Sequence, residues 1–556
     1  MTTETKQCNT CRQEFILDSN DLGFYEKMKV PAPGVCPDCR FKMRALFRNE
    51  TTLYSGRKCA LCDKSVISMY NPKLPYTVYC YNCFYSEKWD PRDYAIDYDE
   101  NKPFLEQFKE LLGKVPKINT YLSLGLGPNI NSEYVNMVGG CKNCYLVFNG
   151  GPNEDTMYSR GTRMVSDCCD LYFATKSERC YECINVQESA GILWGQNISG
   201  SVDCAFVLNC RGLVNCFGCV NLNNKSHHFL NEPLAPEEYN KRVKEILGSY
   251  EKTEAFKLEF EKFAAQFPVR ENNNLKTVNS TGDYLYECKN VRDSFEVTKS
   301  EDCRYLVASK EIRNSIGTIG YGMNSEHLLE CVATGLSSNV IGTYGAENCT
   351  NILYGFYTAK CNDCIGCDAL RNGKYCILNK QYDKAEYDRL REKIIAELTE
   401  AGLYGLMIPP ELAPFAYNET IAQDNMPMTK EEALAQGLRW EDDIQKTEGK
   451  ETLKPEQIPD HIKDVPDTIT KEILVCTSCN RNYKIIEQEL TFYKKLNIPI
   501  PRKCFYCRHG DRIRRRGPYK FWDRECNKCQ KAIVTNYAPE RPEKVLCEKC
   551  YQREVY

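Results

Sequence analysis

CNTCRQEFILDSNDLGFYEKMKVPAPGVCPDCR, residues 8–40, recurs near the other end of the chain as CTSCNRNYKIIEQELTFYKKLNIPIPRKCFYCR, residues 476–508. Each copy contains a C-x-x-C pair, an equally long intervening segment (12–35 and 480–503) and a second C-x-x-C pair. The copies also share an FY dipeptide, two prolines and an arginine after the last cysteine. A four-cysteine unit has therefore been duplicated and placed at two distant points of one chain.

Each copy is followed by two further C-x-x-C motifs, again at matched spacing. The segments between these two motifs, 63–79 and 530–546, are equal in length. The cysteines of all eight motifs are Cys8, Cys11, Cys36, Cys39, Cys59, Cys62, Cys80, Cys83, Cys476, Cys479, Cys504, Cys507, Cys526, Cys529, Cys547 and Cys550. Each copy is thus a module of two tandem four-cysteine units.

The spacing predicts metal binding rather than redox chemistry. Zinc prefers four thiolates in a tetrahedron, and one C-x-x-C turn presents two of them on one side of the ion. A second turn about 15–25 residues later supplies the other two. Redox C-x-x-C chemistry uses one such motif at the start of a helix in a βαβ unit, which eight paired motifs do not resemble. We expect zinc as the cofactor, in four structural sites with four cysteine ligands each.

Length and composition bound the class of protein. At 556 residues the chain is longer than one ordinary domain, and a net charge of −3 excludes no class of partner. The 34 cysteines would indicate disulfides in a small secreted protein, but this chain is long and starts with the polar sequence MTTETKQCNT. No apolar run approaches the roughly 18 residues of a membrane span. We expect a cytoplasmic protein, without a membrane partner, that keeps its thiolates for metal.

The middle of the chain contains many short segments with the composition of β-strands. Pieces such as CYLVF, CDLYFA and CAFVLN recur between Asn, Gly, Ser and Asp residues. Their irregular spacing, roughly 14–25 residues, favours the coils of a β-solenoid over a sandwich. This region is itself duplicated at an offset of 147–148 residues, since CFGCVNLNNKSHHFLN from Cys216 matches CIGCDALRNGKYCILN from Cys364. Each half then enters a helical sequence, EEYNKRVKEIL or AEYDRLREKII, which we expect to cover the sheet edge.

The predicted fold class is therefore mainly β, with a central duplicated β-solenoid-like region, capping helices and two flanking modules of tandem four-cysteine treble-clef or zinc-ribbon type. In chain order, the predicted segments are a zinc module (1–94), a connecting helix (95–118), solenoid half 1 with its helix (119–268), solenoid half 2 with its helix (269–404), an acidic Pro-rich linker (405–470) and a second zinc module (471–556).

The middle region holds the remaining 18 cysteines (34 − 16), and some of these also form C-x-x-C pairs, such as Cys180/Cys183 and Cys216/Cys219. A metal site is one interpretation. The second half loses such partners, however, since Cys144 aligns with Val291, and free cysteine often behaves as a small buried hydrophobe. We therefore expect these cysteines in the core.

Charge is unevenly placed along the chain. Residues 471–556 carry 20 Lys/Arg against 10 Asp/Glu, whereas residues 403–470 carry 6 against 14. The acidic segment either serves solubility or covers a basic surface of the same chain. Arginines recur at intervals of four after the second motif of each module, which places each set on one helical face. In the first module (Arg40, Arg44 and Arg48) we favour a solvated face. In the second, the basic residues predicted to contact nucleic acid are Arg508, Arg512, Arg514, Arg515, Arg516, Lys520 and Arg524.

Candidate catalytic groups are scarce. The chain has five histidines, and neither a P-loop, a nucleophile elbow nor H-E-x-x-H occurs. A zinc ion held by four cysteines has no open coordination position for a substrate. The sequence thus predicts a protein that is not an enzyme.

The two quoted stretches resemble the probable zinc-ribbon domain, in which an FY dipeptide, proline and C-x-x-C-R follow a first cysteine pair. The whole layout, including CFGCVNL, IPDHIKDVPD and YAPERPEKVLCEKCY, resembles an uncharacterised family of zinc-ribbon, cysteine-rich repeat proteins from candidate-phyla bacteria of the Patescibacteria type. The resemblance implies zinc and this architecture, and it supplies no activity.

Two hypotheses of function follow. In the first, the basic C-terminal module binds nucleic acid or a ribonucleoprotein, with phosphate contacts from its arginines and base stacking by Phe505, Tyr506, Phe521 and Trp522. In the second, the protein is a cytoplasmic scaffold whose solenoid binds proteins and whose zinc ions are purely structural. The basic patch narrowly favours nucleic acid as the partner.

Overall fold

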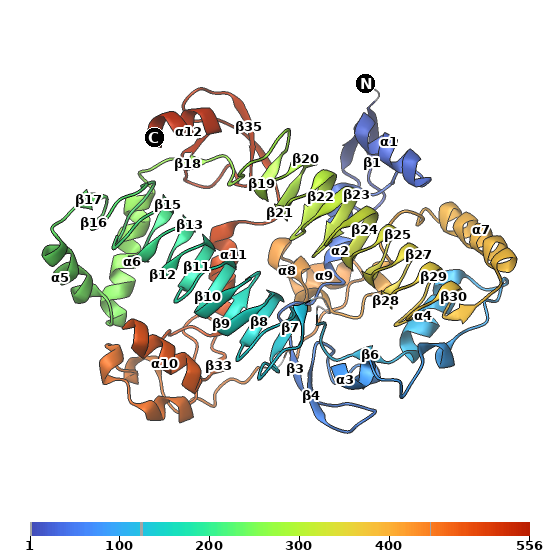
Figure 1. Cartoon of the computed structure of the whole chain (residues 1–556), viewed down its shortest axis with the longest axis horizontal. Coiled ribbons are helices and arrows are strands. Elements are labelled where there is room, and N and C mark those ends of the chain that lie inside the picture. Colours follow the sequence, from blue (N-terminus) through green and yellow to red (C-terminus); the bar gives the residue numbers. More distant parts are fainter. Residues whose placement is uncertain (1–2, 123–125, 445, 556) are drawn as a thin grey trace. The chain divides into compact units, whose positions relative to one another are not determined.

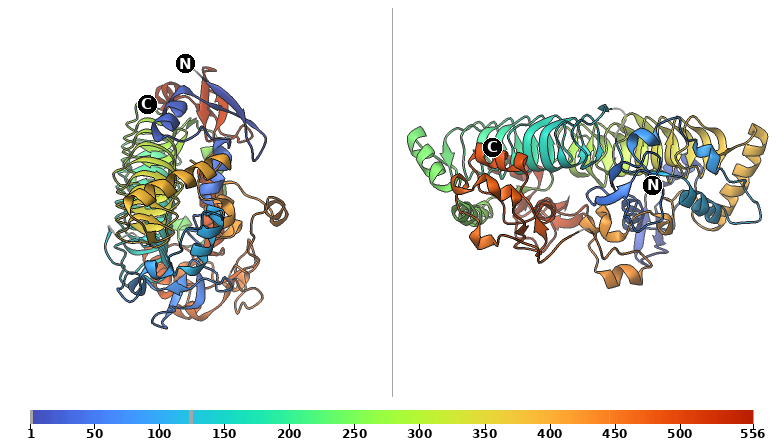
Figure 2. Two further views of the ribbon diagram at one scale, coloured as in Figure 1. Left: turned by 90° about the vertical axis from the view of Figure 1, so that its right-hand side faces the viewer. Right: turned by 90° about the horizontal axis from the view of Figure 1, so that it is seen from below.

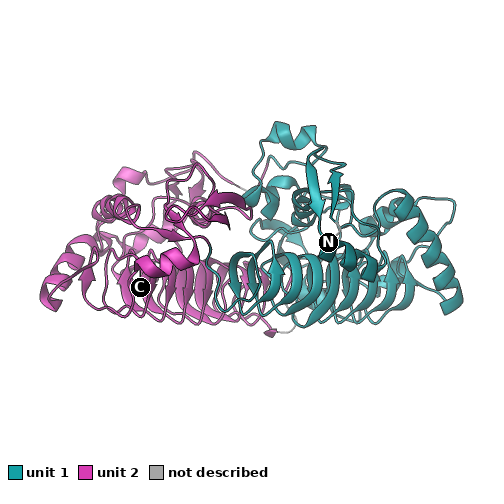
Figure 3. Cartoon of the chain, turned by 90° about the horizontal axis from the view of Figure 1, so that it is seen from above, with its two compact units in different colours: residues 1–120, 272–442 teal, residues 121–271, 443–556 magenta. Residues whose placement is uncertain are grey.

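A computed structural model describes residues 3–122, 126–444 and 446–555. The chain forms two compact units, each assembled from two separate stretches (Figure 3). Unit 1 comprises residues 1–120 and 272–442, and unit 2 comprises residues 121–271 and 443–556. Each unit therefore combines one cysteine module with the half of the middle region that is more distant from it in the sequence.

In unit 1 the cysteine module is built from short antiparallel strand pairs and helices. In chain order it contains β1 (Glu4–Gln7), β2 (Glu14–Leu17), α1 (Ser19–Met28), α2 (Pro37–Ala45), β3 (Tyr54–Lys58), β4 (Ser65–Ser68), β5 (Val78–Tyr79), α3 (Tyr81–Phe84), the 3-10 helix η1 (Pro91–Tyr94), α4 (Phe104–Lys114) and β6 (Lys117–Ile118).

The second stretch of unit 1 is a sheet followed by helices. It contains β19 (Gly282–Tyr286), β20 (Lys289–Arg292), β21 (Ser294–Thr298), β22 (Glu301–Val307), β23 (Ile312–Ile319), β24 (Ser325–Gly335), β25 (Ser338–Ile341), β26 (Tyr344–Glu347), β27 (Thr350–Leu353), β28 (Phe356–Ala359), β29 (Asn362–Ile365), β30 (Lys374–Ile377), β31 (Lys380–Gln381), α7 (Lys384–Glu400), η3 (Pro410–Leu412), η4 (Tyr417–Glu419), α8 (Ile421–Asn425) and α9 (Lys430–Ala435).

Unit 2 has the same plan in the opposite chain order. Its sheet half contains β7 (Val135–Val138), β8 (Tyr145–Gly150), β9 (Asn153–Arg160), β10 (Val165–Thr175), β11 (Tyr181–Gln187), β12 (Ala190–Leu193), β13 (Gln196–Ser199), β14 (Val202–Ala205), β15 (Leu208–Arg211), β16 (His228–Phe229), β17 (Glu232–Pro233), α5 (Pro236–Ile246), α6 (Tyr250–Ala264) and β18 (Val269–Arg270). Its module half contains η5 (Pro455–Gln457), η6 (Ile462–Asp464), η7 (Asp467–Lys471), β32 (Leu474–Val475), β33 (Asn482–Tyr483), α10 (Glu487–Leu496), α11 (Phe505–Arg516), β34 (Trp522–Glu525), β35 (Ala532–Thr535), β36 (Val545–Leu546) and α12 (Glu548–Val555).

The large sheet of each unit is almost entirely parallel, and its strands follow one another as the successive arrows of Figure 1 show. The register joins each position to the one twelve further along the chain. In unit 2, Ile184 pairs with Gln196 and Ile198 pairs with Cys210. In unit 1 the same register recurs, apart from an interval of eleven where Val278 pairs with Lys289 and of thirteen where Ile312 pairs with Ser325.

Two predictions for the middle region, its fold class and the spacing of its strands, can be compared with this register. The sequence pattern predicted a mainly β middle region, which is confirmed. The expected irregular spacing of its strands is wrong, because paired positions recur at one nearly constant interval. The interval was hidden in the sequence because several strands are interrupted by short turns.

Within this twelve-residue register the backbone has a shorter period of three. Residues with positive φ recur at every third position, for example Met164 (51°), Asp167 (50°), Asp170 (60°), Phe173 (57°) and Lys176 (49°). A left-handed residue turns an extended chain sharply, and Asn and Asp adopt that conformation more readily than most residues. The abundance of Asn and Asp in the middle region follows from this demand.

Core positions also recur at every third residue. Cys168, Leu171, Ala174, Ser177 and Cys180 are all buried. Two core positions that both hold cysteine therefore read as C-x-x-C without any metal. The local period of three, and not a ligand spacing, produces these motifs in the middle of the chain.

Serine and cysteine make the same hydrogen bonds at these core positions. Ser177 Oγ donates to the carbonyl of Thr175 (3.0 Å) and accepts from the N–H of Ser189 (3.3 Å). Cys168 Sγ donates to the carbonyl of Ser166 (3.1 Å) and accepts from the N–H of Cys180 (3.4 Å). Small side chains with one donor and one acceptor thus suit the interior, because buried polar groups must be satisfied.

Each sheet is followed by a helix, as predicted. In unit 1, α7 lies beyond the last strands of its sheet, and in unit 2, α5 does so (Figure 2). Tyr387 of α7 is buried and its ring centroid lies 5.6 Å from that of Tyr375.

The predicted linker is folded over much of its length. Ile408, Phe415 and Tyr417 are buried, and the ring of Phe415 stacks on Tyr70 at 5.5 Å between centroids. The short helix predicted from TKEEALAQG is present as α9. Every helix within the described residues is too short or too polar to span a lipid bilayer.

Candidate metal centres

The sixteen predicted ligands gather into four groups of four. These groups are Cys8/Cys11/Cys36/Cys39, Cys59/Cys62/Cys80/Cys83, Cys476/Cys479/Cys504/Cys507 and Cys526/Cys529/Cys547/Cys550, and within each group the sulfur atoms all lie within 4.8 Å of one another. Each group joins two C-x-x-C motifs that the spacing had paired. The sequence therefore predicted every member of these four groups.

The first motif of each group forms the same tight turn. In the first group, the N–H of Cys8 donates to the carbonyl of Gln13 (2.8 Å) and the N–H of Arg12 donates to the carbonyl of Cys8 (3.0 Å). The residue after the second cysteine is left-handed in all four turns, at Arg12 (φ 63°), Asp63 (60°), Asn480 (59°) and Gln530 (58°). This turn places both sulfur atoms of the motif on one side.

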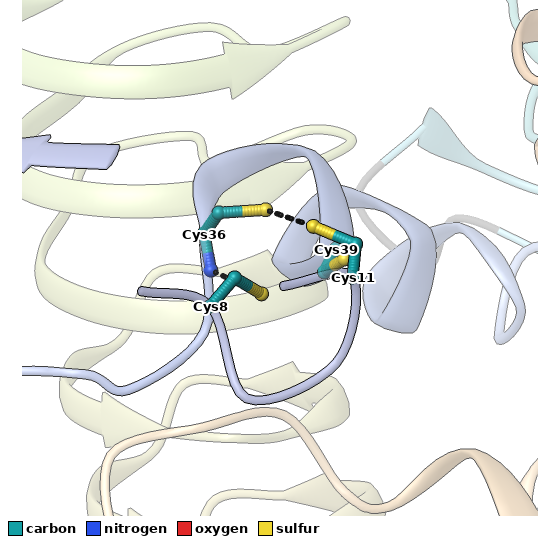
Figure 4. A group of neighbouring side chains, drawn as sticks. All are labelled: Cys8, Cys11, Cys36 and Cys39. Carbon is teal, nitrogen blue, oxygen red and sulfur yellow. Dashed lines mark hydrogen bonds between the residues drawn. The ribbon is translucent and has the colours of Figure 1, made fainter. Parts of the chain in front are cut away.

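The second motif of each group lies at the start of a helix, which the sequence predicts for the motifs that end at Cys39 and Cys507. Cys36, Cys80 and Cys504 are the residues that precede α2, α3 and α11. The N–H of Cys36 donates to Cys8 Sγ (3.2 Å), and the sulfur atoms of Cys36 and Cys11 lie 3.6 Å apart (Figure 4). The helix therefore directs backbone N–H groups at sulfur.

These N–H groups favour the thiolate at the first cysteine of each group. Although burial opposes ionisation, N–H groups that include that of Cys504 lower the pKa of Cys476 to about 7. N–H groups outweigh burial in the same way at Cys59, whose pKa falls to about 7, and at Cys526, whose pKa falls to about 6. The last cysteines resist ionisation, since hydrogen bonding with Cys529, together with burial, raises the pKa of Cys550 to about 12.

Four thiols this close cannot all ionise unless a cation balances their charge. A divalent metal ion supplies that charge, and four sulfur ligands leave it without an open position. The geometry thus fits a metal ion that stabilises the fold.

The two longer of these helices, α2 and α11, which follow the first group of each module, carry buried arginines. In unit 1, Arg40 Nη1 lies 2.8 Å from Glu330 Oε1 and donates to the hydroxyl of Tyr25 (2.9 Å). Arg44 also pairs with Glu330, and all three charged side chains are at most 1% exposed. The α2 helix is therefore held on the sheet by charge-assisted contacts with β24.

Unit 2 repeats the arrangement. Arg508 Nε and Arg512 Nη2 each lie 2.8 Å from a carboxylate oxygen of Asp170 on β10. Although burial opposes its charge, Asp170 and Glu489 help to raise the pKa of Arg508 far above its ordinary value. Asp170 and Glu330 occupy the same position of β10 and β24, two strands whose burial patterns differ only at the second residue.

These contacts decide where the predicted nucleic-acid residues lie. Arg508, Arg512 and Arg516 are at most 5% exposed, so they are unavailable to a nucleic acid. The prediction for these three is wrong, because the face that their spacing defines is turned inward. The solvated face expected for the first module is likewise wrong, since Arg40 and Arg44 are buried, as is Arg48.

The other four predicted residues are wholly or partly accessible. Arg514 (side chain 74% exposed) pairs with Asp511, and Lys520 is exposed with its Nζ 5.4 Å from the ring centroid of Trp522. Arg515 and Arg524 are half-buried, and each donates to a main-chain carbonyl, at 3.3 Å and 3.2 Å.

The four aromatic residues predicted to stack on bases are likewise partly buried and partly accessible. Phe505 is buried and stacks on Tyr158 at 5.5 Å between ring centroids, so it cannot stack on a base. Tyr506, Phe521 and Trp522 are half-buried.

The 18 central cysteines are all buried, and within the described ranges none belongs to a group of metal-ligand geometry. Most of them line the cores of the two sheets together with Leu, Ile and Val. This placement agrees with the expected core role.

The sequence does not predict that Asp170 and Glu330 are the sheet residues that pair with the arginines of the modules. Each follows a core position, Cys168 or Leu328, by two residues. Other acidic residues such as Glu182 hold the same position of the period, so the pattern alone could not single out these two.

In comparisons with known proteins, no family model matches the chain and no curated protein is similar to it.

Proposed function

We propose that this protein is a non-enzymatic zinc-binding scaffold whose two cysteine modules are folded by four structural zinc ions and fixed to β-solenoid halves that bind other proteins. The observation that carries this choice is the inward direction of the module arginines. Arg512 and Arg44 form ion pairs with buried carboxylates of the sheets, so they attach the modules to the sheets and are unavailable to a partner. We therefore assign the modules a structural role.

Zinc is the metal that best fits the four groups. Four thiolates in a tetrahedral arrangement favour zinc or an iron–sulfur centre, and the tight C-x-x-C turns at matched spacing favour a single zinc ion in each group. The resemblance to zinc-ribbon proteins of candidate-phyla bacteria points in the same direction.

The β-solenoid assignment rests on the twelve-residue register of the parallel sheets. In such a repeat each coil contacts its neighbours and offers a long outer surface, on which partners bind in other repeat proteins. The thiol-rich, disulfide-free core suits a reducing compartment such as the cytoplasm.

Nucleic acid remains the second candidate partner, since Arg514 is exposed and the exposed Lys520 lies over the ring of the half-buried Trp522. Phosphate contacts of this kind weaken steeply as salt concentration rises.

One pair of measurements tests the proposal. Elemental analysis of full-length protein purified without chelator should return four zinc ions per chain. RNA and DNA binding, measured by fluorescence anisotropy at low and high salt, should be weak. Tight binding that R514A/K520A abolishes would replace the scaffold with the nucleic-acid function. Clearly fewer than four zinc equivalents would overturn the structural role of the metal.

A further inference from the structure

Unit 1 contains a pocket of about 280 Å³ beside the C-terminal end of α1. Strands β25, β27 and β29 form its floor and α7 forms one side. Three cations line it, Lys27 and Lys29 from the end of α1 and Arg391 from α7, and no Asp or Glu side chain does. The pocket is therefore electropositive.

These cations are not neutralised by the chain itself. Lys27, Lys29 and Arg391 are all exposed. Among the residues that the structure describes, no carboxylate forms an ion pair with any of them. Their charge is available to a group that enters from solvent.

The floor of the pocket is aliphatic. Ile341 pairs in register with Leu353, and Leu353 with Ile365, so the three side chains follow one another across neighbouring parallel strands. Strands in a sheet are about 4.8 Å apart, so these residues form a continuous apolar strip, of which Ile341 (9%) and Leu353 (7%) keep some exposed surface whereas Ile365 keeps 1%. A ligand that fits has an aliphatic part beside a negative charge.

The duplicated module shows which kind of segment lies at this helix end in unit 2, where the contacting residues Lys494 and Arg502 occupy the positions of Glu26 and Gly34 in unit 1. In unit 2 the counterpart of α1 is α10, and it contacts η6 and η7 of the stretch IPDHIKDVPDT, residues 458–468. Lys494 Nζ lies 2.6 Å from an oxygen of Asp467. Arg502, a few residues after α10, donates to the carbonyl groups of Ile458 (3.1 Å) and Pro459 (3.0 Å).

The helix ends themselves correspond. Lys29 and Asn497 are both left-handed C-caps, with φ of 55° and 50°. A Cβ built on Gly248 would lie 2.5 Å from His461 Cε1 and 2.9 Å from Asn497 Oδ1, so His461 and Asn497 lie against the same glycine. In unit 2 an acidic segment rich in Ile, Val and Pro lies at this helix end, whereas in unit 1 the same end borders the pocket and the chain after α7, where Gly405 lies against Val30.

We propose that the pocket beside α1 binds an acidic peptide segment of a protein partner that carries an aliphatic side chain. The aliphatic side chain lies over the exposed atoms of Ile341 and Leu353, and the carboxylates lie beside the three cations. This inference rests on the proposed scaffold function and names the chemistry of its partner.

The chain supplies a suitable probe. A fluorescein-labelled peptide IPDHIKDVPDT is titrated with full-length, metal-loaded protein, and binding is followed by fluorescence anisotropy. We expect saturable binding that K27E/K29E/R391E weakens at least tenfold. The control K88E/K109E/K360E makes the same number of charge reversals at exposed lysines of unit 1 outside the pocket and should change Kd less than twofold. A peptide with serine in place of all aliphatic residues tests the strip without altering the protein, and it should bind at least tenfold more weakly.

Several results would overturn the proposal. These are the absence of saturable binding, equal weakening by the two triple variants, and undiminished binding of the serine peptide. Binding of laurate at this pocket in place of the peptide, or self-association that K27E/K29E/R391E abolishes, would assign it to another occupant. Zinc content is measured on every variant, because a loss of metal concerns the scaffold itself, whereas loss of peptide binding at four zinc per chain concerns only this pocket.

Discussion

Arg512 Nη2 lies 2.8 Å from Asp170 Oδ1, and neither side chain has any exposed surface. One residue comes from the helix that starts at a metal-ligand motif and the other from the parallel sheet of the same unit. The pair therefore couples the fold of the cysteine module to that of the sheet.

Removal of the Asp170 carboxylate should strongly lower the free energy of unfolding. Asp170→Asn removes the carboxylate shared by Arg508 and Arg512 and leaves Glu489, 3.6 Å from Arg508, as the remaining buried partner of Arg508. Breaking a buried ion pair in this way costs about 3–5 kcal/mol. We expect a loss of this size in the free energy of unfolding measured by denaturant titration. Asp302→Asn is a suitable control, because Asp302 has a hydrogen bond from Asn290 but no ion pair among the described residues. Equal stability of the two variants would contradict the role of Asp170.

Removal of the corresponding carboxylate in unit 1, that of Glu330, should also destabilise the protein. Glu330→Gln leaves Arg40 and Arg44 without their carboxylate, so we expect destabilisation of the same order, about 3–5 kcal/mol. Protease cleavage within residues 3–94 at native conditions reports whether the first module is released. If cleavage were to increase only in the C-terminal module, the contact of Arg40 and Arg44 with Glu330 would not hold the first one.

Ligand and core cysteines should differ in their effect on metal content. Cys36→Ser removes a sulfur from one group and should lower zinc from four equivalents to three. Cys219→Ser, also in a C-x-x-C motif, changes a buried core residue and should leave four. Elemental analysis of both proteins checks this, and a loss of zinc from the Cys219 variant would show that the central thiols bind metal.

Core cysteines should tolerate serine better than a larger residue. Cys180 occupies a position of the three-residue period at which Ser177 and Ser189 make equivalent hydrogen bonds. We expect Cys180→Ser to cost less than about 1.5 kcal/mol, whereas Cys180→Leu overpacks the interior and costs about 1–3 kcal/mol. Thermal unfolding followed by circular dichroism shows which variant is the more stable. A Cys180→Leu variant more stable than Cys180→Ser would contradict the close packing around Cys180.

A buried ion pair in unit 1 predicts a pH dependence of stability. Burial outweighs the attraction of Lys117 and raises the pKa of Asp368 from 3.8 to about 6. The folded chain therefore holds this proton more tightly than the unfolded chain. The stability that Asp368 contributes thus falls as pH rises from about 4 to about 6 and changes no further above that range.

The double variant K117M/D368L isolates this contribution. It removes both charges together, so it leaves no buried charge of this pair uncompensated, and its stability should lack the decrease of up to about 3 kcal/mol between pH 4 and 6 that Asp368 contributes. Denaturant titrations of both proteins across this range give the difference. Parallel pH profiles would contradict the raised pKa of Asp368.

Part of the fold was accessible from the sequence. The mainly β texture and the closing helices follow from local composition, and both are present. The period of three was also accessible, since residues such as Cys180, Cys183 and Val186 recur at that interval. Short apolar pieces obscure this period, because it is visible position by position and not from strand to strand.

By itself the sequence determined the four sulfur groups, because a C-x-x-C turn and the loop to its partner are local features that need only a short stretch of chain. Tertiary structure alone decided which side of the arginine helices is buried. A spacing of four defines a face, but the direction of that face depends on a carboxylate from a distant strand. Only the folded chain brings Asp170 to Arg512, or Glu330 to Arg44, and so offsets the cost of burying their charges.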